Sequence, residues 1–343
     1  MADTMSKRKS KKRIGRKILG FLLILSLIGV ALGYSYVDRM LGLIQRPPET
    51  QESLSMEEVQ KIENQTDPVD TEFTGPVLDP TDVTWVTEPF EVPEKEYITN
   101  ILLIGQDRRP GESRQRSDAM ILCSVNMQTK TLTMTSFLRD LYVQIPGYRD
   151  NRLNTAYALG GMDLLCQTLK QNFGVQVDGC IEVDFSQFEK IIDLMGGVDV
   201  ELTSAEAGHL YYRYGLYLST GMNHLDGEAA LAYSRIRYIG TDFGRTNRQR
   251  TVLTALIEQS KELRLKEFQI LVQEVLGLIT TDMTNDQIFD LVLECFPLLN
   301  ELQVKTQYVP ADGTYQFASI RGMSVIVADM NANRQLLMDT IME

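Results

Sequence analysis

Apolar residues in this chain occur in short continuous runs that polar turns separate. Residues 97–105 (YITNILLIG) are mainly apolar up to a closing glycine and precede charged residues, a pattern typical of a buried strand that enters a loop. Residues 119–125 and 131–137 flank the polar turn 126–130 and therefore predict a β-hairpin. The same pattern predicts further strands at residues 181–185, 198–202, 304–310 and 323–328.

Other segments carry apolar residues at helical spacing. Leu164, Leu165 and Leu169 predict a helix over residues 161–173, and a longer helix is predicted over residues 246–265. Because hairpin and crossover signals both occur, we expect an α/β fold: a single domain with a mixed central β-sheet covered by helices on both faces. Further helices are predicted at residues 188–195, 226–233, 268–279 and 285–299.

The first 37 residues predict a membrane anchor ahead of this domain. Residues 7–17 contain eight lysines or arginines, and residues 18–37 follow without a charge, which is long enough to cross a bilayer as a helix. The length of the apolar run and the lack of a small-residue cleavage pattern favour a transmembrane helix over a cleaved signal peptide. We therefore predict a basic cytoplasmic tail (residues 1–17) and a single-pass anchor (residues 18–37), with the bulk of the chain outside the cell.

Residues 38–96 are predicted to form an acidic, proline-containing extracellular spacer. Between residues 45 and 96 the chain has fourteen acidic residues, three basic residues and seven prolines, a composition that disfavours a packed core. Within it, residues 54–62 have the spacing of a short amphipathic helix. The whole chain has a net charge of −12; residues 1–44 contribute +7 and residues 45–96 contribute −11, which leaves −8 for the predicted folded domain, residues 97–343.

Arginine is concentrated in one part of this domain. Thirteen of the sixteen arginines after residue 96 lie between Arg108 and Arg250, and that stretch has only three lysines. A guanidinium presents a planar fork of donors that matches phosphate oxygens, so the bias indicates phosphate recognition. The net negative charge of the domain disfavours nucleic acid as the partner. Four widely spaced cysteines and two histidines indicate neither a disulfide framework nor a zinc site.

The arginines form clusters at the ends of predicted elements. Arg235 and Arg237 would point to one face only if their segment were extended, with Ile236 turned toward the core. Arg245 and Gln249 are four residues apart and would share a helix face, and a cap at residue 246 or 247 would add free N–H groups to an anion site. A solvated surface position is the alternative for each single arginine, but the repeated placement at element ends favours one shared site.

Two aspartates accompany these clusters. Asp107 and Asp118 are eleven residues apart and both adjoin predicted strands, so they suit a hard cation such as Mg²⁺ that is shared with phosphate oxygens. Ion pairing with Arg109 or Arg116 is the alternative, and the residues alone leave both open.

At these positions the chain resembles the LytR-CpsA-Psr family of Gram-positive cell-wall enzymes, from about residue 97 to the C-terminus. The resemblance rests on ordered motifs: NILLIGQD (residues 100–107), RSD (116–118), RD (139–140), NTAY with two glycines (154–161), DLMGGVDV (193–200), LDGE (225–228), YSRIR (233–237) and DFGR with RQ (242–249). One departure is Arg152, which stands where a lysine is common.

The resemblance implies a phosphotransferase that moves a glycopolymer from a polyprenyl-pyrophosphate carrier in the membrane lipid to a peptidoglycan hydroxyl, with Mg²⁺. By matching positions, Asp107 and Asp118 would hold the metal. Arg116, Arg139 and Asp140 are the predicted catalytic residues, although either Asp140 or Asp118 is a candidate base. The residues implied to bind the pyrophosphate are Arg116, Arg139, Arg152, Arg235, Arg237, Arg245 and Gln249.

Two other functions fit the same residues. A regulator or scaffold would bind the polyprenyl (pyro)phosphate without transfer, and a hydrolase would use water as the acceptor. Phosphoryl transfer requires charge neutralisation and in-line positioning more than a protein nucleophile, and arginines with a cation supply both, so transfer is the leading hypothesis.

Overall fold

The computed structural model describes residues 38–47, 54–66, 74–86, 90–108, 114–237, 239 and 242–343, except for the side chains of residues 265–269. The predicted cytoplasmic tail and transmembrane anchor lie outside the described residues. Within the described ranges, no helix combines the length and the apolar character needed to cross a membrane. The chain divides into two compact units, residues 1–44 and 45–343, and the fold below is that of the second.

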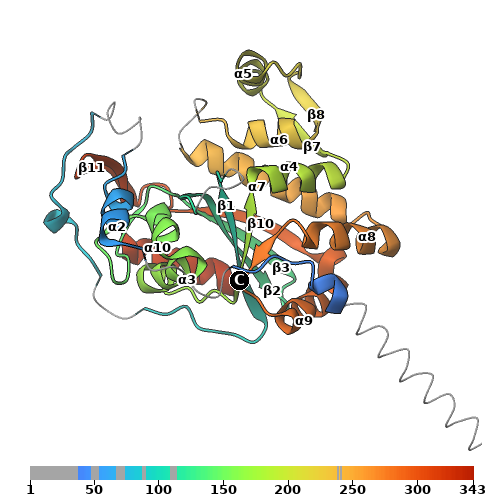
Figure 1. Cartoon of the computed structure of the whole chain (residues 1–343), viewed down its shortest axis with the longest axis horizontal. Helices are drawn as coiled ribbons and strands as arrows, with labels where there is room; N and C mark the ends of the chain where they lie inside the picture. Colours follow the sequence, from blue (N-terminus) through green and yellow to red (C-terminus); the bar gives the residue numbers. More distant parts are fainter. Residues whose placement is uncertain are drawn as a thin grey trace, which may run out of the picture. The chain divides into compact units, whose positions relative to one another are not determined.

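A six-stranded mixed sheet forms the centre of this unit (Figure 1). The pairs β10–β3 and β1–β6 are parallel, whereas β3–β2, β2–β1 and β6–β9 are antiparallel. The predicted hairpin is the β2–β3 pair. In spatial order the strands are β10 (Gln303–Val309), β3 (Thr131–Phe137), β2 (Ser117–Asn126), β1 (Ile98–Gln106), β6 (Gly179–Asp184) and β9 (Thr280–Thr281).

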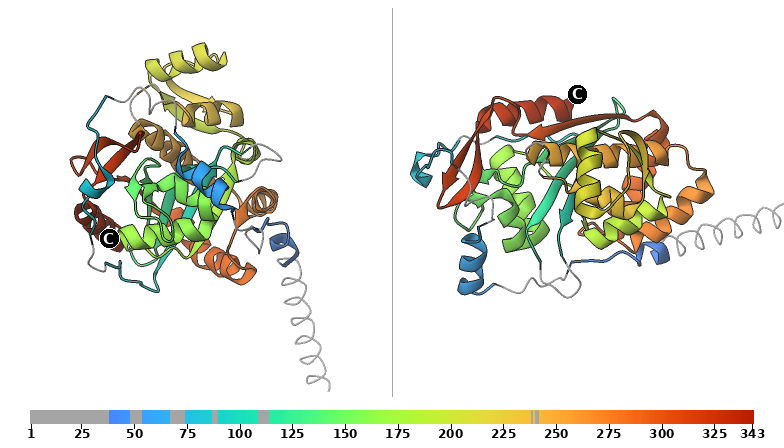
Figure 2. Two further views of the ribbon diagram at one scale, coloured as in Figure 1. Left: turned by 60° about the vertical axis from the view of Figure 1, so that its left-hand side comes forward. Right: turned by 90° about the horizontal axis from the view of Figure 1, so that it is seen from above.

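Helices cover both faces of the sheet because its central strands are apolar on both sides. Leu102 and Leu122 point into a core that also contains residues of α3 (Leu153–Phe173) and α10 (Met330–Met342). Their neighbours Leu103 and Ile121 point to the other face, toward α7 (Asp242–Ser260). The right-hand view of Figure 2 shows α3 on one side of the strands and α6 (Gly227–Ser234) on the other. The predicted fold class is confirmed for this sheet and its helical layers.

Smaller elements complete the unit. Short two-stranded sheets pair β4 (Tyr142–Val143) with β5 (Asn151–Arg152), β7 (Val198–Leu202) with β8 (Gly221–Leu225), and β11 (Tyr315–Ile320) with β12 (Met323–Ala328). The remaining helices are α2 (Met56–Glu63), η2 (Pro80–Asp82), α4 (Phe185–Leu194), α5 (Ser204–Tyr214), α8 (Leu265–Leu276), α9 (Asn285–Cys295) and η3 (Phe296–Glu301).

Local sequence explains where several helices begin and bend. Capping boxes start α4 at Asp184, α5 at Thr203 and α9 at Thr284, where each side chain accepts from a backbone N–H of the first turn. Helix α3 is interrupted at Gly160 and Gly161, and Gly161 has a φ of +63°, a conformation that other residues rarely adopt.

Part of the predicted spacer packs against this unit. The predicted amphipathic helix is α2, which places Leu54, Val59 and Ile62 against the core that α3 and α10 share. Trp85 packs there too and stacks on Tyr142, with ring centroids 5.7 Å apart. Apolar packing therefore extends N-terminally beyond residue 97, where the domain boundary was predicted.

Candidate functional site

A cavity of about 450 Å³ lies between the sheet and helices α4, α5, α6 and α7. Its body is apolar, because the strand positions that face α7 are leucine, isoleucine and valine and the helices add phenylalanine and leucine. Such a lining suits a hydrocarbon chain. The apolar lining residues are Leu103, Ile104, Ile121, Ile181, Val183, Phe185, Phe188, Ile191, Leu231, Leu253, Leu256 and Ile279.

The same cavity also has a charged part. The side chains there come from the end of β1, the start of β2, the segment after α6 and the first turns of α7, so strand ends and helix starts converge. Six of the residues that the sequence singled out line it: Asp107, Asp118, Arg235, Arg237, Arg245 and Gln249. A long apolar tail and an anionic head group would therefore find matching surfaces in one cavity.

Asp118 lies among three arginines, two of which line the cavity. Its Oδ1 is 2.8 Å from Nη1 of Arg139 and 3.4 Å from Nη2 of Arg237, and its backbone oxygen accepts from Nη2 of Arg245 at 3.5 Å. Burial raises the pKa of the Asp118 carboxyl, but the guanidinium groups of Arg139, Arg245 and Arg237 together outweigh it and hold the pKa below its usual value. Asp118 is therefore ionised at neutral pH.

Arg139 joins this group to a second carboxylate. Its Nε is 3.5 Å from Oδ2 of Asp140, and Nη1 of Arg152 is 3.7 Å from Oδ1 of the same carboxylate. Burial raises the pKa of Asp140; Arg139 opposes the rise and Asp242 adds to it, and the net pKa is above the usual value. Arg139 and Asp140 do not line the cavity directly, so they form a layer behind Asp118.

Arg116 and Arg152 face helix α2. Nη2 of Arg116 donates to the backbone oxygens of Ile62 at 3.0 Å and Gln65 at 3.1 Å, and Nη2 of Arg152 donates to the Gln65 oxygen at 3.1 Å. The carbonyl end of a helix carries partial negative charge, which the two guanidinium groups compensate. Neither arginine lines the cavity, although Arg152 shares the Asp140 carboxylate with Arg139.

The Arg235 to Arg237 segment is not extended throughout. Arg235 is the C-cap of α6 with φ −99° and ψ −1°, so the extended conformation that would place both arginines on one face is not present at this residue. Ile236 is fully buried, as expected, and both arginines still line the cavity. Nη2 of Arg235 is 3.6 Å from Oδ2 of Asp107, and its Cζ is 4.3 Å from the centroid of the Phe185 ring.

Arg245 belongs to the first turn of α7. The helix begins at Asp242, whose Oδ1 is 2.6 Å from Nη2 of Arg245. Thr246 and Asn247 therefore lie inside the helix, so neither residue caps it. Burial lowers the pKa of the Arg245 guanidinium, against the effect of Asp242. Gln249 follows one turn later and lines the same cavity, as the four-residue spacing predicted.

The family model described as the LytR_cpsA_psr family matches residues 52–338, most of the chain. The chain belongs to the LytR_cpsA_psr family. The match includes α2, which the sequence analysis assigned to the spacer. Membership confirms the predicted family, and the predicted enzyme class, a phosphotransferase, agrees with the name of a relative given below.

Characterised relatives support this membership. The chain is 31% identical over 249 residues to "Regulatory protein MsrR" of Staphylococcus aureus (strain COL), a match that covers 71% of this chain and 74% of the relative. It is 32% identical over 228 residues to "Polyisoprenyl-teichoic acid--peptidoglycan teichoic acid transferase TagU" of Bacillus mycoides, covering 64% of this chain and 71% of the relative.

Solved structures of LytR_cpsA_psr proteins have a similar fold. "TagT bound to LIIa-WTA" aligns with a TM-score of 0.59 at 27% identity and covers 72% of this chain and 90% of that chain. A second structure, of the family protein YwtF (TagT) "with bound octaprenyl pyrophosphate lipid", aligns with a TM-score of 0.56 at 25% identity and covers 76% and 94%.

The carboxylates of this LytR_cpsA_psr site fit a magnesium ion that takes part of its ligands from phosphate. Among the described residues no group of three or more His, Cys, Asp or Glu side chains forms a closed metal site. Mg²⁺ is commonly held by one or two carboxylates together with substrate phosphates and water, and Asp107 and Asp118 line one cavity beside arginines. Magnesium at these two residues stays a prediction.

Helix α5 contributes cavity residues that the sequence analysis missed. His209, Arg213 and Tyr214 line the cavity. No helix was predicted there, although Thr203 and Glu206 have the spacing of a capping box and form one. That spacing was the available signal for the helix, whereas nothing local indicated that its last turns would reach the cavity.

Proposed function

We propose that this chain is a membrane-anchored extracellular phosphotransferase that moves a glycopolymer from a polyprenyl-pyrophosphate carrier to a peptidoglycan hydroxyl, assisted by Mg²⁺. The observation that carries the proposal is that one cavity combines an apolar body with a part lined by arginines and carboxylates. The relatives support it: one is named for teichoic acid transfer to peptidoglycan, and a solved neighbour holds octaprenyl pyrophosphate.

The arginines would bind the pyrophosphate and stabilise its developing charge. Arg235, Arg237 and Arg245 line the cavity and would contact the phosphates directly, while Arg139, held by Asp118, would add charge from behind. Gln249 would donate from the same helix face as Arg245. A magnesium ion at Asp107 and Asp118 would neutralise further phosphate charge when bound.

Transfer requires one bond to form and one to break. The acceptor hydroxyl oxygen bonds to the phosphorus that carries the glycan, and the bond from this phosphorus to the bridging oxygen breaks. Polyprenyl phosphate then leaves with the bridging oxygen. The hydroxyl proton requires an acceptor. Asp118 lines the cavity, whereas Asp140, whose pKa is raised, lies behind it and would need a connecting water to take this proton.

The test is a transfer reaction with the purified full chain in detergent. Polyprenyl-pyrophosphate-linked glycan, peptidoglycan and MgCl₂ are supplied, and released polyprenyl phosphate and glycan bound to peptidoglycan are both measured. Transfer predicts equal amounts of the two products and loss of both in Asp118→Asn, with wild-type rates in the exposed control Asp339→Asn.

The other outcomes identify the competing functions. Release of the lipid phosphate with no glycan attached to peptidoglycan would mean hydrolysis, with water as the acceptor. Lipid that binds and is recovered unchanged would mean a regulator or scaffold. Either result would overturn the proposed transfer.

A further inference from the structure

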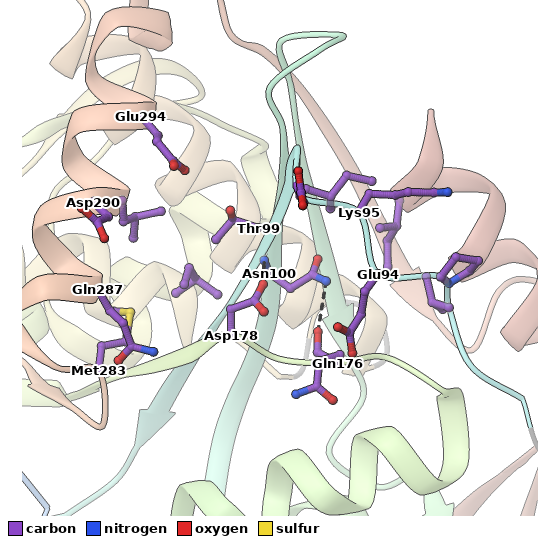
Figure 3. Close-up of a pocket in the computed structure, with 17 residues that line it drawn as sticks. Glu94, Lys95, Thr99, Asn100, Gln176, Asp178, Met283, Gln287, Asp290 and Glu294 are labelled. Atoms are coloured by element: carbon purple, nitrogen blue, oxygen red, sulfur yellow. Dashed lines mark hydrogen bonds between the residues drawn. The ribbon is translucent and has the colours of Figure 1, made fainter.

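A second cavity, of about 560 Å³, lies at the opposite end of strand β1 from the predicted pyrophosphate site (Figure 3). Ile98 and Asn100 at the start of β1 line it, whereas Leu103 and Asp107 at the other end of the strand belong to the first cavity. Helix α9 forms another wall. The two cavities therefore have different linings, and the second is not part of the site described above.

Acidic side chains dominate this second cavity. Five carboxylates line it with one ammonium group, that of Lys95. None of the five is ion-paired with a described residue. In Figure 3, Asp290 and Glu294 of α9 lie on one side of Asn100, and Glu94 lies on the other side. The five are Glu94, Glu96, Asp178, Asp290 and Glu294.

A buried amide oxygen points independently to a ligand. Asn100 is only 9% exposed, and its Nδ2 donates to the backbone oxygen of Gln176 at 3.0 Å. Its Oδ1 is buried and has no hydrogen-bond partner among the described residues. A buried acceptor without a partner costs free energy, so a donor is expected to reach it. Beside it, burial raises the pKa of Asp178 and Glu94 raises it further, while the bond from the Asn100 N–H opposes the rise.

The arrangement of the lining residues favours an organic cation over a metal ion. The five carboxylates do not form a closed cluster, since the described residues include no group of three acidic, histidine or cysteine side chains placed to hold a metal ion. The lining also includes the apolar residues Ile101, Met283 and Leu291. Carboxylates on both sides of Asn100, together with these apolar lining residues, match a ligand with ammonium groups joined by an alkyl chain, because such a ligand buries methylene groups and pairs at both ends.

We propose that this cavity binds an organic polycation of the alkyl-diamine class, with one ammonium group near Asp290 and Glu294 and another near Asn100, Asp178 and Glu94. The site is separate from phosphotransfer and does not depend on the proposed function. An ammonium group would supply the donor that Asn100 Oδ1 lacks and would offset the uncompensated carboxylates.

Isothermal titration calorimetry of the full chain in detergent tests the proposal, with spermidine and cadaverine as probes and CaCl₂ as the metal alternative. The test variant is Asp290→Asn with Glu294→Gln, because both side chains are exposed on α9. The matched control is Asp286→Asn with Asp339→Asn, which removes two exposed carboxylates outside the cavity.

We expect saturable binding of spermidine that the test variant weakens by at least about tenfold and the control by less than about twofold, since only local charge pairs are lost. Asn100→Leu, which removes the buried acceptor, is expected to weaken binding as well. Equal loss in both double variants would mean non-specific attraction to an acidic protein. Calcium binding without amine binding would mean a metal site, and either result, like the absence of any binding, would overturn the proposal.

Discussion

Replacement of Arg139 by glutamine tests the charge arrangement most directly. Its guanidinium contacts Asp118 at 2.8 Å and Asp140 at 3.5 Å, and only 10% of the arginine side chain and 22% of each carboxylate side chain are exposed. Removing one partner of a buried ion pair commonly costs about 3–5 kcal/mol, because the other charge stays buried without compensation. Arg237 and Arg152 remain beside the two carboxylates. We therefore expect the free energy of unfolding to fall by about 3 kcal/mol, near the lower end of this range.

The pH dependence of this loss follows from the two carboxyl groups. The pKa of Asp118 is lowered by folding, so its stabilising effect is present above its unfolded pKa of about 4 and disappears as the pH falls through the folded value. The pKa of Asp140 is raised by burial, and the loss of Arg139 should raise it further. In the variant, Asp140 therefore takes up a proton, and loses its uncompensated charge, at a higher pH than Asp118 does. The deficit of Arg139→Gln is therefore expected to be largest at neutral pH and to shrink on acidification.

Urea unfolding at several pH values measures this deficit. Trp85 is the single tryptophan of the chain and packs on Tyr142, so its fluorescence reports on unfolding of this unit. Lys305→Gln is the control: it removes one side of an ion pair with Glu343 at 3.1 Å that is largely exposed, which is expected to cost about 0–1 kcal/mol. A deficit below about 1 kcal/mol at pH 7, or one that stays constant down to pH 4, would contradict the assigned charge network.

Three further predictions concern the lipid, the metal and the thiols. Phe188→Glu places a charge in the apolar body of the first cavity and is expected to weaken binding of octaprenyl pyrophosphate at least about tenfold in a displacement assay; an unchanged Kd would place the lipid elsewhere. Asp107→Asn is expected to raise the MgCl₂ concentration for half-maximal turnover by about tenfold, and an unshifted titration would remove this residue from the metal site. The sulfur atoms of Cys166 and Cys180 are 3.2 Å apart and fourteen residues apart in sequence, so diamide should link them and stabilise the fold by about 3 kcal/mol; mass spectrometry that finds both thiols free would refute this.

Much of the fold was predictable because its strands are long, apolar and bounded by polar turns. Thr131–Phe137, Val198–Leu202 and Met323–Ala328 have the predicted bounds. Helix starts were less predictable: α3 begins at Leu153 and α7 at Asp242, ahead of the first residues with clear apolar spacing. Polar residues in those first turns are held by contacts with distant segments, as Arg245 is by Asp118, and such contacts leave no periodic pattern.

The candidate site shows a similar limit. Residue types indicated which arginines and aspartates belong together, and six of them do line one cavity. Which of the predicted residues line the cavity and which lie behind them was not predictable. This depends on the strand face and the helix turn that each residue occupies. Arg139 lies behind Asp118 because it follows the end of β3, two strands away from β1 in the sheet, whereas Asp107 follows β1 and lines the cavity itself.

Helix α2 changes how the acidic segment before the domain is understood. Its composition indicates a solvated tether, yet its carbonyl end accepts hydrogen bonds from Arg116 and Arg152, two of the predicted pyrophosphate ligands. The bonds from Nη2 of both arginines to the Gln65 oxygen fix the orientation of the two guanidinium groups. The same bonds compete with phosphate for these arginines. The segment that connects the domain to the predicted anchor thus holds Arg116 and Arg152, which do not line the cavity, and a pyrophosphate would have to compete with these bonds to reach either arginine.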